Sequence, residues 1–188
     1  MAEINQQSIY SKLSEEETRY LDDLILRDAL TGAYNKRKFD EDIGLLIDMM
    51  NRQEDGGACF LYIDVDNFKK YNDTKGHGKG DELLRGVTGS VKQDLRSYDR
   101  LHIYRCGGDE FQVILPNTPL DIGRKIAERL RKKIEEECGV TVSIGMSHYK
   151  ETSDNIRDFK KHADDAMYMA KNNGRNKVVV YGDPEYFT

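Results

Sequence analysis

Residues 101–115 read LHIYRCGGDEFQVIL, two strand-like runs separated by a pair of glycines and a pair of acids. The runs 101–105 and 111–115 consist mainly of aliphatic and aromatic residues, and Gly107-Gly108 between them is a hairpin signal. The acids Asp109-Glu110 fit the solvated tip of a hairpin, because acidic residues beside glycine are common in such turns. They also fit a ligand site, so the rest of the chain has to decide between the two interpretations.

Outward from this hairpin, helical and strand-like segments alternate along the chain. The run 58–65 (ACFLYIDV) is almost continuously apolar, which is typical of a strand buried on both faces. The order of elements predicts an α/β (α+β) fold of the βαββαβ type, in which helices flank a palm-like central mixed sheet. We expect helices over 36–50, 79–95, 120–136 and 156–172, and strands over 58–65, 101–105, 111–115, 140–148 and 177–181.

The composition describes one highly charged globular domain. A chain of 188 residues has the length of a single domain, and its 34 acidic and 29 basic residues leave a net charge of −5. Such a chain is a poor partner for a nucleic-acid polymer, since modules that bind nucleic acid are strongly basic. No apolar run is long enough for a transmembrane helix, and the N-terminus lacks the pattern of a signal peptide. With three widely spaced cysteines and no CxxC pair, we expect reduced thiols in a cytoplasmic protein.

The first 27 residues differ from the rest because they contain neither glycine nor proline. Ile9, Leu13, Tyr20 and Leu24 fall on one face of a helix here, and charged residues fall on the opposite face. The apolar face fits packing against its own domain, or a stalk that pairs with a second copy of the chain. We expect a helical stalk or linker over 1–27, a catalytic domain over 28–182 and a C-terminal tail over 183–188.

Asp64 and Asp66 end the buried run 58–65, and open α/β sheets usually place ligands at the carboxyl ends of their strands. Both acids also fit an ordinary turn that caps the next helix. In a βαββαβ sheet, however, the first strand and the central hairpin are neighbours, so Asp64 and Asp109 are expected to converge. Clustered carboxylates repel one another unless a divalent cation lies between them, and an all-oxygen ligand set suits Mg²⁺ bound to substrate phosphates. The pattern therefore predicts metal-assisted nucleotidyl transfer.

Three basic side chains could bind the phosphates of such a substrate. Lys69 follows the Asp64 strand, and Lys171 and Arg175 flank the end of helix 156–172. Each alone is an ordinary surface charge, but beside a carboxylate–metal centre they form a clamp for a triphosphate. The glycine-rich stretch 76–80 (GHGKG), ahead of a helix, could also bring backbone N–H groups to an anion.

Asn72 and Asp81 are suited to read a base. An amide and a carboxylate together complement the O6 acceptor and the N1–H and N2–H donors of guanine. Asp81 also fits an acid stabilised in the first turn of a helix by the macrodipole. His77, flanked by glycines, fits contact with substrate and a hydrogen bond to the turn backbone equally well.

Five motifs, in order, resemble the GGDEF family of diguanylate cyclases, and the resemblance covers residues 28–180. They are residues 28–37 (DALTGAYNKR), 64–81 (DVDNFKKYNDTKGHGKGD), 107–111 (GGDEF), 141–145 (TVSIG) and 163–176 (ADDAMYMAKNNGRN). The resemblance implies a nucleotidyl-cyclase-like fold and the condensation of two GTP molecules into cyclic di-GMP and two pyrophosphates. It also implies a homodimer of facing half-sites, in which each 3′-hydroxyl attacks the α-phosphate of the other GTP. The family links dimerisation to an upstream helix, which favours the stalk interpretation, and such domains can follow a sensor domain.

The resemblance also implies roles for single residues. Asp64, the backbone carbonyl of Val65, Asp109 and Glu110 would hold two Mg²⁺ (or Mn²⁺) ions. Asp109 or Glu110 would assist deprotonation of the 3′-hydroxyl, and Lys69 belongs to the same catalytic group. For the substrate, Asn72 and Asp81 would read guanine, His77 and Phe68 would lie near the nucleotide, and Lys69, Lys171 and Arg175 would bind its phosphates.

One motif departs from the family pattern. The product-inhibition motif RxxD stands five residues before the glycines in the family, whereas seven residues separate Arg96 and Asp99 from Gly107 here. Arg96 and Asp99 are either an inhibitory site for cyclic di-GMP with a bulge, or a fortuitous match.

Two other functions compete with an active cyclase. One is a non-catalytic module that binds GTP or cyclic di-GMP, and the other is a cyclase that makes a GMP–AMP dinucleotide. The intact acids of the GGDEF motif favour catalysis, and Asp81 favours guanine.

Overall fold

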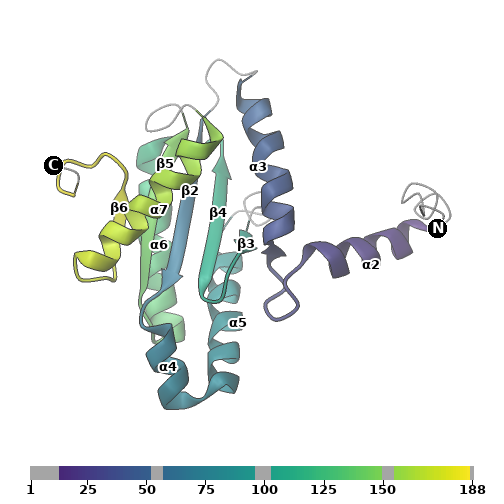
Figure 1. Cartoon of the computed structure of the whole chain (residues 1–188), viewed down its shortest axis with the longest axis horizontal. Helices are drawn as coiled ribbons and strands as arrows, with labels where there is room; N and C mark the ends of the chain where they lie inside the picture. The colour runs from purple at the N-terminus through teal and green to yellow at the C-terminus, as the bar shows by residue number, and fades with distance from the viewer. Residues whose placement is uncertain (1–12, 52–56, 96–102, 150–154, 187–188) are drawn as a thin grey trace, which may run out of the picture.

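The computed structural model describes residues 13–51, 57–95, 103–149 and 155–186 of the chain. Six strands form one mixed sheet in the order β1-β3-β4-β2-β5-β6, with helices on both of its faces (Figure 1). This confirms the expected α/β fold. The strands are β1 (Tyr34–Asn35), β2 (Ala58–Val65), β3 (Ile103–Arg105), β4 (Glu110–Pro116), β5 (Val142–Tyr149) and β6 (Val178–Val180). The helices are α2 (Glu15–Leu26), α3 (Lys36–Asn51), α4 (Phe68–Lys75), α5 (His77–Asp94), α6 (Leu120–Cys138) and α7 (Ile156–Asn172).

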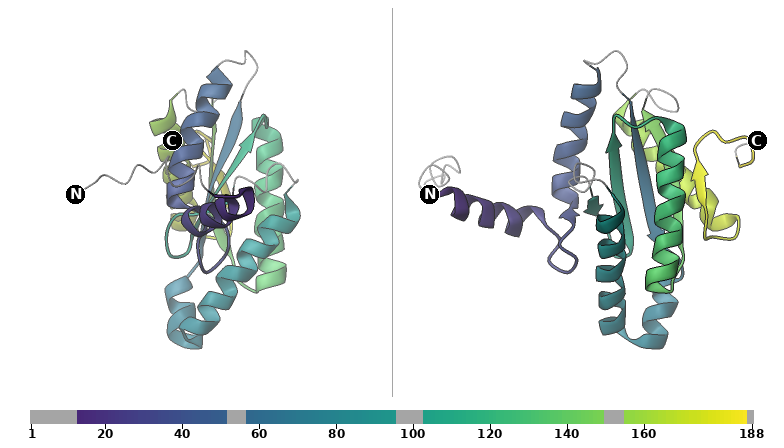
Figure 2. Two further views of the ribbon diagram at one scale, coloured as in Figure 1. Left: turned by 90° about the vertical axis from the view of Figure 1, so that its right-hand side faces the viewer. Right: turned by 180° about the vertical axis from the view of Figure 1, so that it is seen from behind.

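The central strand β2 is buried from both sides, as its apolar run predicts. Its odd-numbered residues, such as Leu61 and Ile63, share a core with α5 and α6. Phe60, on the other face, packs with Phe39 of α3 and Phe159 of α7. The two views of Figure 2 show α3 and α7 on one side of the sheet and α5 and α6 on the other. Successive side chains of β2 point to opposite faces of the sheet, so this one strand packs against helices on both sides. The fold therefore has three layers, with the sheet between two layers of helices.

The strand pairing positions the acidic residues. The strands β3 and β4 form the antiparallel hairpin predicted around Gly107-Gly108, and β4 also pairs antiparallel with β2. In this register Asp64 lies opposite Glu110. The end of β2 and the tip of the hairpin therefore share one edge of the sheet.

Most element bounds agree with the pattern of the sequence, and β2 and α7 agree at both ends. The pattern did not predict α4, because this short helix is mostly polar and buries none of its residues fully; Phe68 and Tyr71 are only partly buried against the core. It begins after Asn67, whose left-handed φ of 57° turns the chain out of β2. The helix α5 begins at His77 and not at residue 79, so most of the expected glycine-rich turn is helical. The two-residue strand β1 was also not expected, since its pairing with β3 is entirely non-local.

The N-terminal helix α2 extends away from the sheet (Figures 1 and 2). It begins with a capping box in which the Ser14 hydroxyl accepts from the Glu17 amide and Glu17 accepts from Ser14. None of its residues is buried, and the side chains of Tyr20 and Leu24 are 65% and 61% exposed. The first twelve residues of the predicted stalk lie outside the described residues. In the part of the chain that the structure describes, no helix is both long and apolar enough to cross a membrane.

Candidate active site

The acidic residues predicted from the sequence meet at one edge of the sheet. Asp64 lies opposite Glu110 in the β2–β4 register, and the Val65 amide donates to the Asp109 carbonyl over 3.2 Å. The sheet therefore brings Asp64, Asp109 and Glu110 to the same edge, although 44 residues lie between Asp64 and Asp109 in the sequence.

Asp64 is a buried carboxylate with one cationic partner. The residue is 5% exposed, and Lys171 Nζ lies 2.7 Å from its Oδ2. Burial raises the pKa of Asp64 to about 6, Lys171 opposes this shift, and Asp109 and Glu110 add to it. Asp64 is therefore ionised at neutral pH, although burial and the neighbouring acids favour its neutral, protonated form.

We expect Asp64→Asn to make the metal-free protein more stable at pH 7.5, by about 1–3 kcal/mol, because the ionised carboxylate opposes folding. Folding raises the pKa of Asp64 from 3.8 to about 6. The loss of folding stability caused by the ionised carboxylate therefore reaches its full size above about pH 6 and disappears near pH 4. Thermal melts in EDTA at several pH values test this. A variant less stable than the parent at pH 7.5 would show that the ion pair with Lys171 dominates instead.

The donor set fits a hard divalent cation. Carboxylate and carbonyl oxygens are the ligands that Mg²⁺ and Mn²⁺ prefer. Among the described residues, no three acidic, histidine or cysteine side chains are grouped closely enough to hold a metal ion by themselves. A cation beside Asp64 would nevertheless reverse the effect of burial and of Asp109 and Glu110 on its pKa.

Asp66, the second acid of the β2 motif, has a structural role. It is 6% exposed, and its carboxylate accepts from the hydroxyls of Thr141 and Ser143, both at 2.7 Å. It also accepts from the backbone amide of Asn176 at 3.1 Å. Asp66 therefore fastens the loop after α7 to the sheet. Because that loop contains Arg175, Asp66 positions a predicted phosphate-binding residue.

Asn72 lies where α4 and α5 approach each other. Its Oδ1 is buried and has no hydrogen-bond partner among the described residues. A Cβ added at Gly80 would lie 1.8 Å from this oxygen and 3.2 Å from Phe68 Cζ. The structure thus brings Asn72, Phe68 and Gly80 together, next to Asp81 in the sequence. A buried amide oxygen without a partner is unfavourable unless a ligand donates to it.

The other predicted substrate-binding residues lie on the surface around this edge. His77 begins α5, and Asp81 follows in its first turns. Lys69 lies in the first turn of α4, directly after β2. Arg175 follows α7 with a left-handed φ of 63°, and its amide donates to the Ala170 carbonyl over 3.0 Å. The candidate product-inhibition residues, Arg96 and Asp99, lie outside the described residues.

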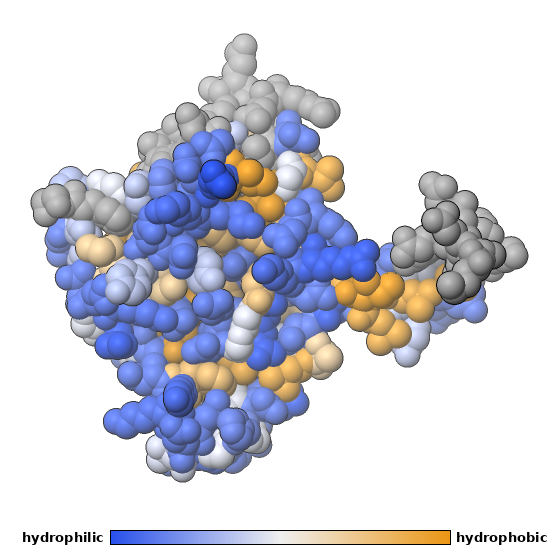
Figure 3. All heavy atoms as spheres, viewed as in Figure 1, coloured by the Kyte–Doolittle hydropathy of each residue, from blue (hydrophilic) through white to orange (hydrophobic). Residues whose placement is uncertain are grey.

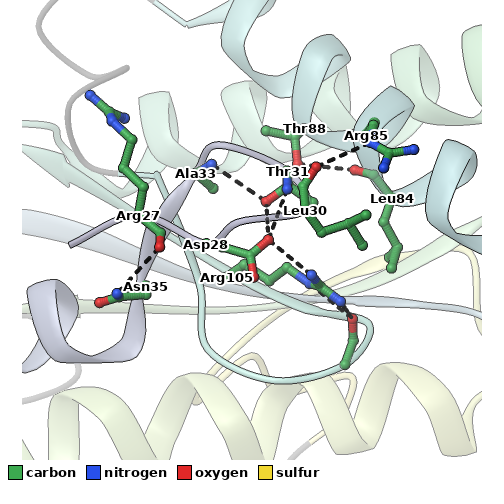
Figure 4. A network of polar contacts seen from close by, with 11 residues as sticks. Arg27, Asp28, Leu30, Thr31, Ala33, Asn35, Leu84, Arg85, Thr88 and Arg105 are labelled. Atoms are coloured by element: carbon green, nitrogen blue, oxygen red, sulfur yellow. Dashed lines mark hydrogen bonds and ion pairs between the residues drawn. The ribbon is translucent and has the colours of Figure 1, made fainter. Parts of the chain in front are cut away.

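A network that the sequence did not reveal holds the acidic hairpin (Figure 4). Arg105 donates to the Gly108 carbonyl from Nε and Nη2, at 3.1 and 2.7 Å, and to Asp28 Oδ1 from Nη1 at 2.9 Å. Asp28 also accepts from the Thr31 amide and hydroxyl, at 2.9 and 2.6 Å. Burial acts to raise the pKa of Asp28, but the hydrogen bonds from Thr31 and Arg105 outweigh it and lower the pKa. The turn after α2 is therefore bonded directly to the hairpin that carries Asp109 and Glu110.

The sheet thus gathers the buried Asp64 and the acids Asp109 and Glu110 at one edge, with Lys171 paired to Asp64. A family model described as "Diguanylate cyclase, GGDEF domain" matches residues 25–177. The chain therefore belongs to the GGDEF-domain family.

Curated relatives agree with this assignment. The chain is 38% identical over 160 residues to "Diguanylate cyclase DgcM" of Escherichia coli (strain K12), which covers 81% of this chain and 38% of that protein. It is 38% identical over 169 residues to "Response regulator PleD" of Caulobacter vibrioides, covering 84% and 36% respectively. The chain spans less than half the length of the curated relatives it matches.

The fold matches that of solved GGDEF domains. The coiled coil and GGDEF domain of DgcB from Caulobacter crescentus, in complex with c-di-GMP, superposes with a TM-score of 0.82. The match covers 93% of this chain and 94% of that one at 24% identity, so it supports the fold alone.

Proposed function

We propose that this chain is the catalytic domain of a diguanylate cyclase, which condenses two GTP molecules into cyclic di-GMP and two pyrophosphates. The observation that carries the proposal is the buried Asp64 opposite Glu110, with Asp109 bonded to the neighbouring backbone. The relatives named as diguanylate cyclases and the intact GGDEF motif support it.

In this proposal Asp64, the Val65 carbonyl, Asp109 and Glu110 bind two Mg²⁺ (or Mn²⁺) ions. When bound, the ions activate the attacking hydroxyl and stabilise the leaving pyrophosphate. Asp109 or Glu110 takes the proton of the 3′-hydroxyl, with Lys69 beside the reacting phosphate.

The substrate is held at both of its ends. Asn72 and Asp81 read guanine, with His77 and Phe68 near the nucleotide, and the unpartnered Asn72 oxygen supports this assignment. The phosphates are bound by Lys69, Lys171 and Arg175. At each centre a bond forms between the 3′-oxygen and the α-phosphorus of the other GTP, and the bond to pyrophosphate breaks. Because each subunit holds one GTP, the reaction requires a two-fold dimer of facing half-sites.

Incubation of the full chain with GTP and Mg²⁺, followed by chromatography, tests the activity. We expect cyclic di-GMP and pyrophosphate in a 1:2 ratio, and no product in EDTA. A dimeric sample that binds GTP without forming product would instead identify a regulatory module. Formation of a mixed product from GTP and ATP would identify a cyclase of relaxed specificity.

We further propose that α2 pairs with its counterpart in a second copy of the chain. Tyr20, Leu24 and Ile25 are exposed large side chains on α2. The projecting helix shows a group of orange, hydrophobic spheres in Figure 3.

We expect Leu24→Glu to weaken dimerisation at least about ten-fold, since burial of one leucine contributes roughly 1.5–3 kcal/mol. Cyclase activity should fall with it at low protein concentration and recover as the concentration rises. Arg19→Gln, on the charged face of α2, is the matched control. Sedimentation velocity measures the dimer, and an unchanged dissociation constant for Leu24→Glu would contradict the role of α2.

A further inference from the structure

The sheet face below α3 and α7 carries a polar patch beside the acidic residues. In the β2–β4 register, Asp64 lies opposite Glu110 and Tyr62 lies opposite Gln112. Residues two apart on a strand share a face, so all four belong to the face that carries Phe60. Diagonal neighbours on such a face can reach each other when one side chain is long or aromatic.

Tyr62 makes this diagonal contact with Glu110. Its hydroxyl lies 3.1 Å from Glu110 Oε2. The phenol hydroxyl donates this hydrogen bond, and the carboxylate accepts it.

Gln112 lies opposite Tyr62 on the next strand. The residue is 6% exposed, and its Oε1 accepts from the Cys106 thiol over 3.2 Å. Burial raises the pKa of Cys106 to about 12, so the thiol keeps its proton and remains a donor. The hydrogen bonds from Cys106 to Gln112 and from Tyr62 to Glu110 thus lie on neighbouring strands of the same sheet.

The space around Glu110 shows why this support matters. Tyr62, Gln112, Cys106 and Glu110 all line a cavity of about 600 Å³ between α3 and α7. On another side, a Cβ added at Gly107 would lie 2.7 Å from Glu110 Oε2, so the hairpin backbone confines the carboxylate there. Among the described residues, the Tyr62 hydroxyl is the one hydrogen-bond donor to the Glu110 carboxylate.

We propose that Tyr62 is a positioning residue for Glu110, and that its hydroxyl holds the Glu110 carboxylate in one orientation through their hydrogen bond. Gln112, opposite Tyr62 in the strand register, supports the Tyr62 side chain in that orientation. The inference rests on the proposed role of Glu110 as a metal ligand and adds residues outside the motif to the site. Preorganised ligands bind a cation more tightly than ligands that must first be ordered.

Tyr62→Phe removes only the hydroxyl and tests the proposal directly. We expect Mn²⁺ binding, measured by electron paramagnetic resonance with a non-reactive GTP analogue, to weaken about ten-fold. The kcat should fall by a similar factor, and the KM for GTP should change less than about two-fold. Tyr104→Phe is the matched control, because Tyr104 donates over 2.8 Å to Asp42 Oδ2, away from the acidic edge. It should leave Mn²⁺ binding and kcat within about two-fold of the parent.

A double-mutant cycle tests the support from Gln112. Gln112→Met alone should weaken Mn²⁺ binding about three-fold, and should add almost nothing in the Tyr62→Phe background, because both changes release the same carboxylate. Fully additive effects would overturn the role of Gln112.

The outcomes separate this inference from the proposed function. Unchanged Mn²⁺ binding in Tyr62→Phe, or an equal loss in Tyr104→Phe, would overturn the positioning role even in an active cyclase. Conversely, Mn²⁺ binding that weakens in Tyr62→Phe, in a parent protein that forms no cyclic di-GMP, would contradict the proposed function alone.

Discussion

Asp109→Ala should lower the rate of cyclic di-GMP synthesis at least about 1,000-fold. The carboxylate is proposed to bind metal and is one of two candidates to take the proton, and a positioned base alone contributes roughly 10²–10⁴-fold. Loss of a metal ligand adds to this, because the metal supplies several kcal/mol of charge stabilisation in the transition state.

The fold should survive this substitution. The structural contact of Asp109 is made by its backbone carbonyl, which accepts from the Val65 amide and remains in the alanine variant. Asp121→Ala on α6 is the matched control, since Asp121 is an exposed acid that forms a surface ion pair with Lys125. Circular dichroism and product chromatography should show two folded proteins, of which only Asp121→Ala is active. Near-normal activity of Asp109→Ala would refute the metal assignment.

Gly80→Ala should lower kcat/KM for GTP about 100-fold, mainly through KM. The new methyl group would lie 1.8 Å from Asn72 Oδ1, which is impossible without movement of the amide. Because Asn72 is proposed to read guanine, its displacement removes hydrogen bonds to the base, and each such loss at a buried site costs roughly 1–3 kcal/mol.

Stability should change little in the same variant. Alanine favours a helix over glycine by about 1 kcal/mol, which offsets part of the steric cost. Gly78→Ala is the matched control, since it lies in the same turn of α5 and a Cβ there meets nothing within 4 Å. Calorimetric titration with GTP should show weak binding to Gly80→Ala and ordinary binding to Gly78→Ala. Equal affinities would exclude the packed Asn72 amide as the guanine reader.

Elements with strong local patterns could be predicted from the sequence. The apolar run of β2 and the amphipathic α7 have the expected bounds, because hydrophobic periodicity reports burial directly. The helix α4 could not be predicted in this way, since it is short and mostly polar, and only Phe68 and Tyr71 pack, partly buried, against the core. Its place depends on the turn at Asn67 and on close packing against α5 at Gly80.

The candidate site also has a part that the sequence could predict and a part that it could not. The motif acids could be named from their order along the chain and from their resemblance to a family. Their supporting contacts could not, because Tyr62 reads as an ordinary strand residue and Arg105 as a surface charge. A cation two residues before the paired glycines was the one available signal for Arg105.

The sequence alone determined which side chains are available for chemistry and that two strand ends carry them. Motif order and periodicity suffice for this, because both are local properties of the chain. Only the tertiary structure decided that Asp64 lies opposite Glu110 and that the Tyr62 hydroxyl reaches Glu110. It also decided that the Asp66 carboxylate binds the loop after α7 and does not join the acidic group at the sheet edge. These are properties of strand register, and a shift of one residue would turn every one of these side chains to the opposite face.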